Sequence, residues 1–279
     1  MRGGADIKHI TVKVTGDSLN IYPVCDVQVG AHGVDKDAFQ EYIATAAADP
    51  VGHIIGVGDY TDGVSPSNRK LLMASFVKGE LYDVARDMLD GAAEEQAMVF
   101  QAIVQPTVGK WDAVLGGHHY WEYQPRNNQI ANTDMDIAKF VGAPYVEAAS
   151  LAVVSYVFDK KSVLRVLVTH GLGGTSTFAG PLNQLEKLMR AFDAQVYIVG
   201  HHHKLVAARA VKLEEDAKAP TKLRATDSVL VGAGSWLRGY MADEVTYAEA
   251  GLMVPLATGA PIIRVTKRPN GSFKVRCEI

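Results

Sequence analysis

The chain lacks the features that mark disulfide-bonded, secreted or membrane-spanning proteins. Its 279 residues include only two cysteines, Cys25 and Cys277, which are too few for a disulfide framework and predict a reducing compartment. No apolar run approaches the ~18 residues that a membrane-spanning helix needs, and the first residues contain no apolar signal region. We therefore expect a soluble, cytoplasmic protein without a membrane partner.

An excess of positive charge is also missing. Lysine and arginine number 28 against 31 acidic residues, and the net charge of −3 excludes a general basic field for holding nucleic acid. Any contact with nucleic acid must therefore be local. The hydrophobic content of 48% is enough for a globular core, and no repeat, low-complexity tract or linker divides the chain. We predict one domain that covers residues 1–279.

Short apolar runs typical of buried strands alternate with helical spacing, which predicts an α/β fold. We expect the main strands at 19–25, 53–57, 111–115, 163–169 and 196–199. We expect helices at 35–48 with Asp35 as the cap, at 67–104 with a break near Gly91, at 134–141 and at 181–192.

Turn signals predict three β-hairpins. The paired runs are 9–14 with 18–25, 152–158 with 163–169, and 262–266 with 273–277. A charged excursion at 214–222 is expected to be a solvated loop.

The run at 196–199 ends at Gly200 and is followed by three histidines. Side chains of an extended segment alternate, so His201 and His203 would face one point and His202 would face away from it. Two imidazoles at one point are typical of a metal site. A solvated polar loop is the alternative, and these residues alone do not decide between the two.

Each of the five main strands is followed within a few residues by a group that can bind a metal or move a proton. These groups are Asp26, Asp59, His118 or His119, His170, and His201 with His203. Open α/β sheets bind ligands at the carboxyl ends of their strands, so the groups are expected to meet in one crevice. Mixed carboxylate and imidazole ligands favour Mn²⁺, Fe²⁺ or Zn²⁺ over Mg²⁺ or Ca²⁺. The number of ligands suits two ions ~3.5–4 Å apart.

The order of these motifs resembles that of the calcineurin-like metallophosphoesterases between residues 19 and 204. The D-x-H motif of that family corresponds to Asp26-Val27-Gln28, its G-D-x-x-D motif to Gly58-Asp59-Tyr60-Thr61-Asp62, its later single histidine to His170, and its G-H-x-H motif to Gly200-His201-His202-His203. Residues 229–261 also resemble phage-encoded members of the family.

The resemblance implies an α/β fold with a two-sheet β-sandwich flanked by helices. It implies a hydrolase that uses two divalent metal ions, with Mn²⁺ favoured and Fe²⁺ or Zn²⁺ as alternatives. The implied reaction is attack of a metal-bound hydroxide on a phosphoester, and phosphodiester hydrolysis by a nuclease-like enzyme is favoured. A phosphomonoesterase, or a degenerate member that acts as a protein-binding scaffold, are the alternatives. Whether the substrate is a nucleic acid, a nucleotide or a monoester, and the oligomeric state, stay open.

Ligands are also implied by the resemblance. One metal would be held by Asp26, residue 28, Asp59 and His203. The other would share Asp59 and add His170, His201 and an asparagine from a G-N-H motif. Asp62 would support its loop.

Two departures from the family pattern affect these ligands. Gln28 replaces a histidine and offers a weaker, uncharged amide oxygen, so the first metal should be held less tightly. In the third motif, Gly117 stands in place of the asparagine if His118 is the proton-handling residue, which the strand phase and Tyr120 favour. In the other register, His118 is the metal ligand and His119 handles the proton. Both registers stay open from sequence.

Arg238 follows a strand between Trp236 and Tyr240. A guanidinium suits phosphate, so Arg238 is a candidate for substrate binding. Ordinary packing at the rim of the molecule is the alternative.

Overall fold

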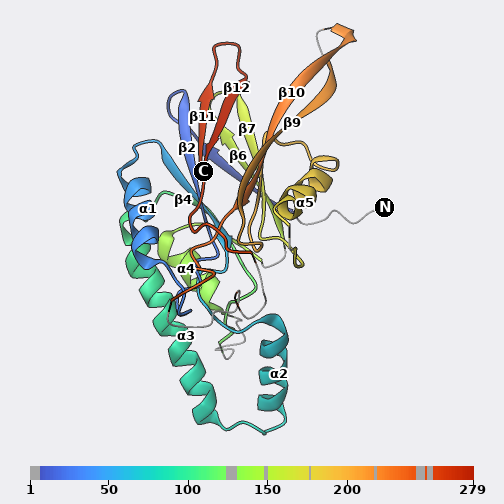
Figure 1. Ribbon diagram of the computed structural model, residues 1–279. Helices are drawn as coiled ribbons and strands as arrows, with labels where there is room; N and C mark the ends of the chain where they lie inside the picture. Colours follow the sequence, from blue (N-terminus) through green and yellow to red (C-terminus); the bar gives the residue numbers. More distant parts are fainter. Residues whose placement is uncertain are drawn as a thin grey trace.

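A computed structural model describes residues 7–123, 131–147, 150–175, 177–216, 219–242, 249 and 254–279. Two six-stranded sheets pack face to face and carry helices on their outer faces (Figure 1). The predicted α/β two-sheet sandwich flanked by helices is confirmed.

Both sheets mix parallel and antiparallel strands. The first has the order β1-β6-β7-β8-β10-β9, formed by Lys8–Lys13, Leu151–Val157, Val163–Thr169, Val196–Val199, Ala219–Ala233 and Leu205–Asp216. The second has the order β12-β11-β2-β3-β4-β5, formed by Phe273–Glu278, Ile262–Lys267, Ser18–Cys25, Gly52–Gly58, Trp111–Leu115 and Tyr145–Val146. Strands β2, β3 and β4 pair in parallel, as do β7 and β8, so each group ends at a single sheet edge.

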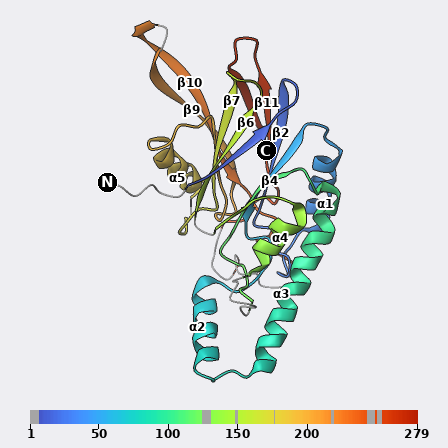
Figure 2. The same ribbon diagram turned by 180° about the vertical axis from the view of Figure 1, so that it is seen from behind.

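The helices are α1 (Lys36–Ala48), α2 (Pro66–Val77), α3 (Asp83–Val104), α4 (Thr133–Val141) and α5 (Ala179–Met189), with a 3₁₀ turn at Gln105–Thr107. Helix α1 contacts β3 and helix α4 contacts β4, whereas α5 contacts β8, β9 and β10. Helix α2 and the adjoining part of α3 extend away from the sheets in both views (Figure 1 and Figure 2). No helix of the described residues is long and apolar enough to cross a membrane.

The main hydrophobic core lies between the two sheets. It contains Val57 and Leu115 from one sheet and Val168 and Ile198 from the other, all essentially inaccessible to solvent. A second core fills the space between the β3 sheet and its helices, and it includes Phe39, Phe100, Trp111 and Trp236. Because central strands are buried on both faces, they carry nearly continuous apolar runs.

Several local predictions are confirmed. Strands β6 and β7 form the expected antiparallel hairpin, as do β11 and β12. The Asp35 side chain accepts a hydrogen bond from the Ala38 amide at 3.3 Å and so caps α1 as predicted.

The predicted hairpin between 9–14 and 18–25 is wrong. Strand β1 pairs in parallel with β6, and β2 pairs with β3 and β11, so the two segments belong to different sheets. The turn signal between them marks a change of direction correctly, but a turn signal carries no information about which strand becomes the hydrogen-bonding partner.

Two further boundaries differ from the prediction. The helical region breaks between Val77 and Asp83, where Gly79 adopts a φ of 70°, and Gly91 lies inside α3. An exposed glycine in a helix costs only ~1 kcal/mol relative to alanine, so its neighbours override it. The segment 214–222 is not a solvated loop, because β9 and β10 continue through most of it as a long hairpin; residues 217–218 lie outside the described residues.

Candidate metal centre

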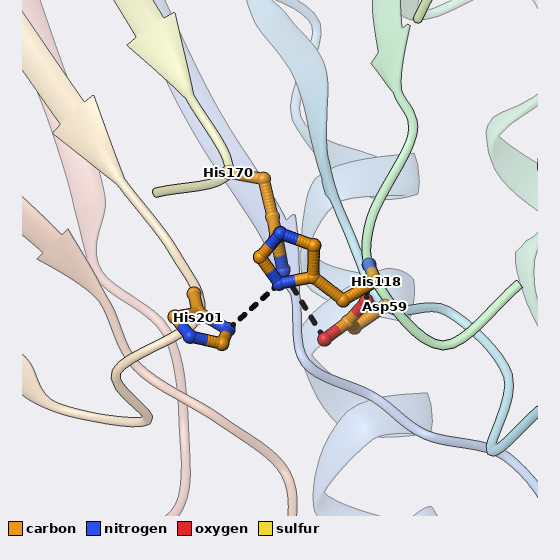
Figure 3. A group of neighbouring side chains, drawn as sticks. All are labelled: Asp59, His118, His170 and His201. Atoms are coloured by element: carbon orange, nitrogen blue, oxygen red, sulfur yellow. Dashed lines mark hydrogen bonds and ion pairs between the residues drawn. The ribbon is translucent and has the colours of Figure 1, made fainter. Parts of the chain in front are cut away.

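The carboxyl ends of β2, β3, β4, β7 and β8 bring the predicted groups into one region. Each of Asp59, His118, His170 and His201 offers a ligand atom, and these four atoms lie within 4.8 Å of one another. Figure 3 shows the four side chains converging from four separate strand ends. A group of one carboxylate and three imidazoles in this arrangement can hold a transition-metal ion.

The backbone is strained at this site. Within the described residues, positive φ angles of 47–63° occur at non-glycine positions in five places, which are Asp26, Gln28, Asp59, His201 and His203. A left-handed backbone costs roughly 1–2 kcal/mol at such residues, and strain of this kind tends to gather at functional sites. All five are positions at which the resemblance implies a metal ligand.

The hydrogen bonds of Asp59 and His170 fix the orientation of both side chains. Asp59 Oδ1 accepts the backbone N–H groups of His118 and His119, the latter at 2.9 Å. The Nδ1 atom of His170 lies 2.7 Å from the Val57 carbonyl oxygen, which requires a proton on Nδ1 and leaves a lone pair on Nε2 of the neutral ring. That Nε2 atom lies 3.1 Å from Asp59 Oδ2.

The two groups also control each other's protonation. Burial alone would raise the pKa of Asp59, but the charge and proximity of His170 outweigh burial and lower the pKa well below its ordinary value. Burial would lower the pKa of His170, whereas the Asp59 carboxylate outweighs this and raises it to about 9. Asp59 is therefore ionised at neutral pH.

Asp26 is held in a similar way. Its Oδ2 atom accepts the His201 amide at 2.9 Å and the Cys25 thiol at 2.7 Å, and its Oδ1 atom lies 3.2 Å from Nε2 of His203. Burial raises the pKa of Asp26, but His203 outweighs this effect and lowers it. A second ionised carboxylate therefore faces the same region.

Three buried atoms of this region make no hydrogen bond and have only ion-pair contacts: Asp26 Oδ1 lies 3.2 Å from His203 Nε2, and Asp59 Oδ2 lies 3.1 Å from His170 Nε2. The two carboxylate oxygens carry lone pairs, and His170 Nε2 carries one when its ring is neutral. A divalent cation could replace the proton between Asp59 and His170, so the residues present fit a metal ion.

His118 lies within the cluster. Its Nδ1 atom is 3.1 Å from Nδ1 of His201, and its ring centroid is 4.7 Å from that of His170. Burial, followed by the charge of His170, lowers the pKa of His118 to about 4, and the same two causes lower the pKa of His201. Both rings are neutral at pH 7 and can act as ligands.

Gly117 is confined by its neighbours. A Cβ atom at this position would lie 2.0 Å from Asp59 Oδ1, so no side chain fits there without a shift of the backbone. The Gly117 N–H donates to Oδ2 of the buried Asp134 at 2.9 Å. The structure therefore leaves no room for an asparagine at position 117.

His119 lies next to Asp62 and not within the four-residue cluster. Its Nδ1 atom is 3.5 Å from Asp62 Oδ1, and its side chain is 29% exposed. The Asp62 carboxylate outweighs burial and raises the pKa of His119. This imidazole is consequently easier to protonate than an isolated histidine.

Three other residues of the sequence motifs, Gln28, His202 and His203, are not members of the group of four. Gln28 donates its backbone N–H to the Asp59 carbonyl oxygen at 3.0 Å, and it is 5% exposed. His203 lies against Asp26, and its pKa is raised by that carboxylate despite the lowering effect of burial. His202 pairs through Nε2 with Oε1 of Gln184 on α5 at 3.0 Å.

Arg238 is engaged in an ion pair. Its Nε and Nη2 atoms lie 3.1 and 2.9 Å from the two carboxylate oxygens of Asp35 at the start of α1. Trp236 is buried against Phe39 and Tyr42, with ring centroids 5.2 Å from each. Packing at the rim, the alternative to substrate binding, describes Trp236, whereas the guanidinium of Arg238 is paired with Asp35 through Nε and Nη2.

Two residues support the site through contacts that the sequence does not indicate. Arg69 donates through Nη1 to the carbonyl oxygens of Val64, His118 and Tyr120 at 3.0, 3.2 and 2.6 Å, and its guanidinium lies 3.8 Å above the Tyr120 ring. Asp134, at the start of α4, supports Gly117. Neither has a sequence signal beyond its place at the start of a helix.

Comparisons with known proteins give structural likenesses only. No family model matches the chain, and no curated protein matches it. Vacuolar protein sorting 29 from Cryptosporidium parvum is 12% identical with a TM-score of 0.38, covering 94% of this chain and 98% of that one. The same protein from Entamoeba histolytica, complexed with zinc, is 11% identical with a TM-score of 0.37, covering 93% and 97%.

A Staphylococcus aureus protein assigned as a 5′-nucleotidase is 11% identical with a TM-score of 0.44. This alignment covers 94% of the present chain but 53% of the nucleotidase. At TM-scores of 0.37–0.44 these likenesses assign no activity, so the site itself must supply the basis for a function.

Proposed function

We propose that the chain is a metal-dependent phosphoesterase of the calcineurin-like type. The observation that carries the proposal is the convergence of Asp59, His118, His170 and His201 within 4.8 Å at the ends of four strands. The order of the motifs along the chain, and the positive φ angles at five implied ligand positions, support it.

Divalent ions bound here would neutralise the charge of a phosphoester and lower the pKa of a bound water molecule. The chain supplies the ligands for such ions and fixes their orientation. Asp59, ionised and held through Oδ1 by two backbone N–H groups, presents Oδ2 to the site. His170 presents Nε2 because the Val57 carbonyl holds its other nitrogen.

We assign the proton-handling role to His119 and the ligand role to His118, which is the second of the two registers. His118 is neutral and its Nδ1 atom lies among the other ligand atoms. His119 lies outside this group, and Asp62 raises its pKa, which favours the protonated imidazole that would donate a proton to the leaving oxygen. Asp62 thus has a role beyond supporting its loop.

The favoured substrate is a phosphodiester, in line with the resemblance of residues 229–261 to phage-encoded members. A phosphomonoesterase is the alternative within the same chemistry. A protein-binding scaffold is favoured by Gln28 and Gly117, the two departures from the family pattern, but the ligand-type residues Asp26, Asp59, His201 and His203 are retained, and each has a strained backbone.

The test compares hydrolysis of bis-p-nitrophenyl phosphate and p-nitrophenyl phosphate with Mn²⁺, Fe²⁺ or Zn²⁺. Asp59→Asn should lower turnover by at least about 10²–10³-fold, because it weakens a ligand placed at the centre of the site. Asp227→Asn, an aspartate with a 62% exposed side chain, is the matched control and should keep full activity. Absence of turnover above the Asp59→Asn level with all three metals would support the scaffold.

A further inference from the structure

We propose that the two metal positions are unequal: Asp59, His118, His170 and His201 bind one transition-metal ion tightly, whereas a second ion at Asp26, Gln28 and His203 is exchangeable. Activity would then follow the free concentration of metal. This inference rests on the proposed function and concerns how the same site is regulated.

The His118 ring lies close to the rings of His201 and His170. Its Nδ1 atom lies 3.1 Å from Nδ1 of His201, and the two ring planes are nearly perpendicular, at 89°. Two imidazole nitrogens that face each other at this distance are compatible either with one shared proton or with one shared ion. The His170 ring lies 4.7 and 5.3 Å from these rings, so three imidazoles surround one point (Figure 3).

The loop that carries His118 packs closely against Asp59. Because Gly117 has no Cβ, its backbone packs directly against Asp59, and a side chain would reach within 2.0 Å of Asp59 Oδ1. The amides of His118 and His119 then bond that same oxygen. This close approach places the His118 side chain among the ligand atoms. Position 117 offers no ligand atom, because glycine has no side chain. Loss of an amide ligand at 117 is therefore offset by an imidazole at 118.

The exchangeable metal position, at Asp26, Gln28 and His203, has fewer imidazoles than the tight one. Oδ1 of Asp26 and Nε2 of His203 lie 3.2 Å apart, and residue 28 is a glutamine with an uncharged amide where the family has an imidazole. His203 does not belong to the cluster of four. With fewer imidazoles and a weaker oxygen donor, this position should bind its ion less tightly.

The ligands of the tight position also predict its metal. Three imidazoles and one carboxylate suit Zn²⁺, which is held by nitrogen and oxygen ligands in tetrahedral geometry. Mn²⁺ is the weakest binder among the divalent first-row metals at such nitrogen-rich sites. We therefore expect Zn²⁺ to be retained at the tight position, with Mn²⁺ confined to the exchangeable one.

The test uses the full chain, purified without a histidine tag, stripped with a chelator and titrated calorimetrically with Zn²⁺. Two binding events should appear that differ in affinity by at least ~10-fold, and one Zn²⁺ per chain should survive desalting. His118→Asn should weaken only the tight event, and Gln28→His should strengthen only the weak one. His9→Asn, an exposed histidine outside the site, is the control and should change neither.

X-ray absorption of the parent loaded with one Zn²⁺ counts its imidazole ligands without any variant, and three are expected. Two or fewer imidazoles, or two equal affinities in the parent, would overturn the inference. Circular dichroism establishes whether His118→Asn is folded. Unequal binding without hydrolysis would overturn the proposed function alone, whereas hydrolysis with two equal ions would overturn this inference alone.

Discussion

Asp134 illustrates how one buried residue can make stability depend on pH. It is 1% exposed, and burial raises its pKa to about 7, against the lowering effect of its hydrogen bond from Gly117. Between pH ~4 and 7 the unfolded state binds fewer protons at this carboxyl than the folded state, so this group makes the protein less stable as pH rises.

Asp134→Asn should remove this penalty, because an amide oxygen still accepts the Gly117 N–H but never ionises. The variant should gain stability over the parent as pH rises from 4 to 8, by up to about 4 kcal/mol. Urea unfolding at pH 5 and pH 8 in the presence of a chelator measures it. An equal stability difference at both pH values would show that Asp134 does not titrate in this range.

His119 and Asp62 make a second prediction at this scale. If His119 donates the proton, kcat/KM should fall as pH rises through its pKa, which Asp62 raises. Asp62→Asn should therefore move this alkaline limb to lower pH. His119→Ala should keep its metal and lose ~10²–10⁴-fold in rate, whereas His118→Ala should lose metal. If the alkaline limb of the kcat/KM profile stayed at the same pH in Asp62→Asn, the assignment of His119 as the proton donor would be contradicted.

The convergence of ligand-type side chains was predictable because each follows an apolar strand, and strand ends of an α/β fold meet. The position of His118 within the cluster, with His119 beside Asp62, was not. It depends on the contact of Gly117 with Asp59, which lie far apart in sequence and whose packing has no local signal. The positive φ angles at Asp26 and Asp59 were equally invisible, because neither residue type requires one.

At the scale of elements, the loop after β4 depends on side chains from α2 and α3. Arg69 of α2 bonds three carbonyl oxygens, and Arg86 of α3 donates to the Glu122 carbonyl at 3.0 Å. These helices therefore hold the segment that contains His118 and His119 against the sheet.

Arg69→Lys should destabilise the protein by about 1–3 kcal/mol, because an ammonium keeps the charge but loses the planar group that stacks on Tyr120. Chemical denaturation measures this effect, and Lys70→Ala at the exposed neighbouring position is the control. Equal stability of the two variants would mean that Arg69 contributes little to holding the loop.

Sequence patterns predicted a helix cap or a hairpin correctly where the pattern depends on neighbouring residues alone. The cap at Asp35 and the hairpin of β11 and β12 need only neighbouring residues. The pairing of β1 with β6 joins segments more than 140 residues apart. A local turn signal between β1 and β2 could not reveal that choice.

At the scale of the whole molecule, the two sheets meet so that the carboxyl ends of β2, β3 and β4 lie opposite those of β7 and β8. The apolar core between the sheets, which includes Val57, Leu115 and Ile198, sets their separation. Folding energy from this core can hold strained and partly unpaired polar groups at the sheet edge. The assignment of residues 1–279 to one domain stays a prediction.

Metal content tests the central claim most directly. Chain purified without a histidine tag and desalted should contain at least one transition-metal ion per molecule by elemental analysis, because ligand atoms of Asp59, His118, His170 and His201 lie within 4.8 Å of one another. Asp59→Asn should contain clearly less, and Asp227→Asn should match the parent. Equal metal content in the parent and in Asp59→Asn, or none in the parent after incubation with Zn²⁺, would contradict the account.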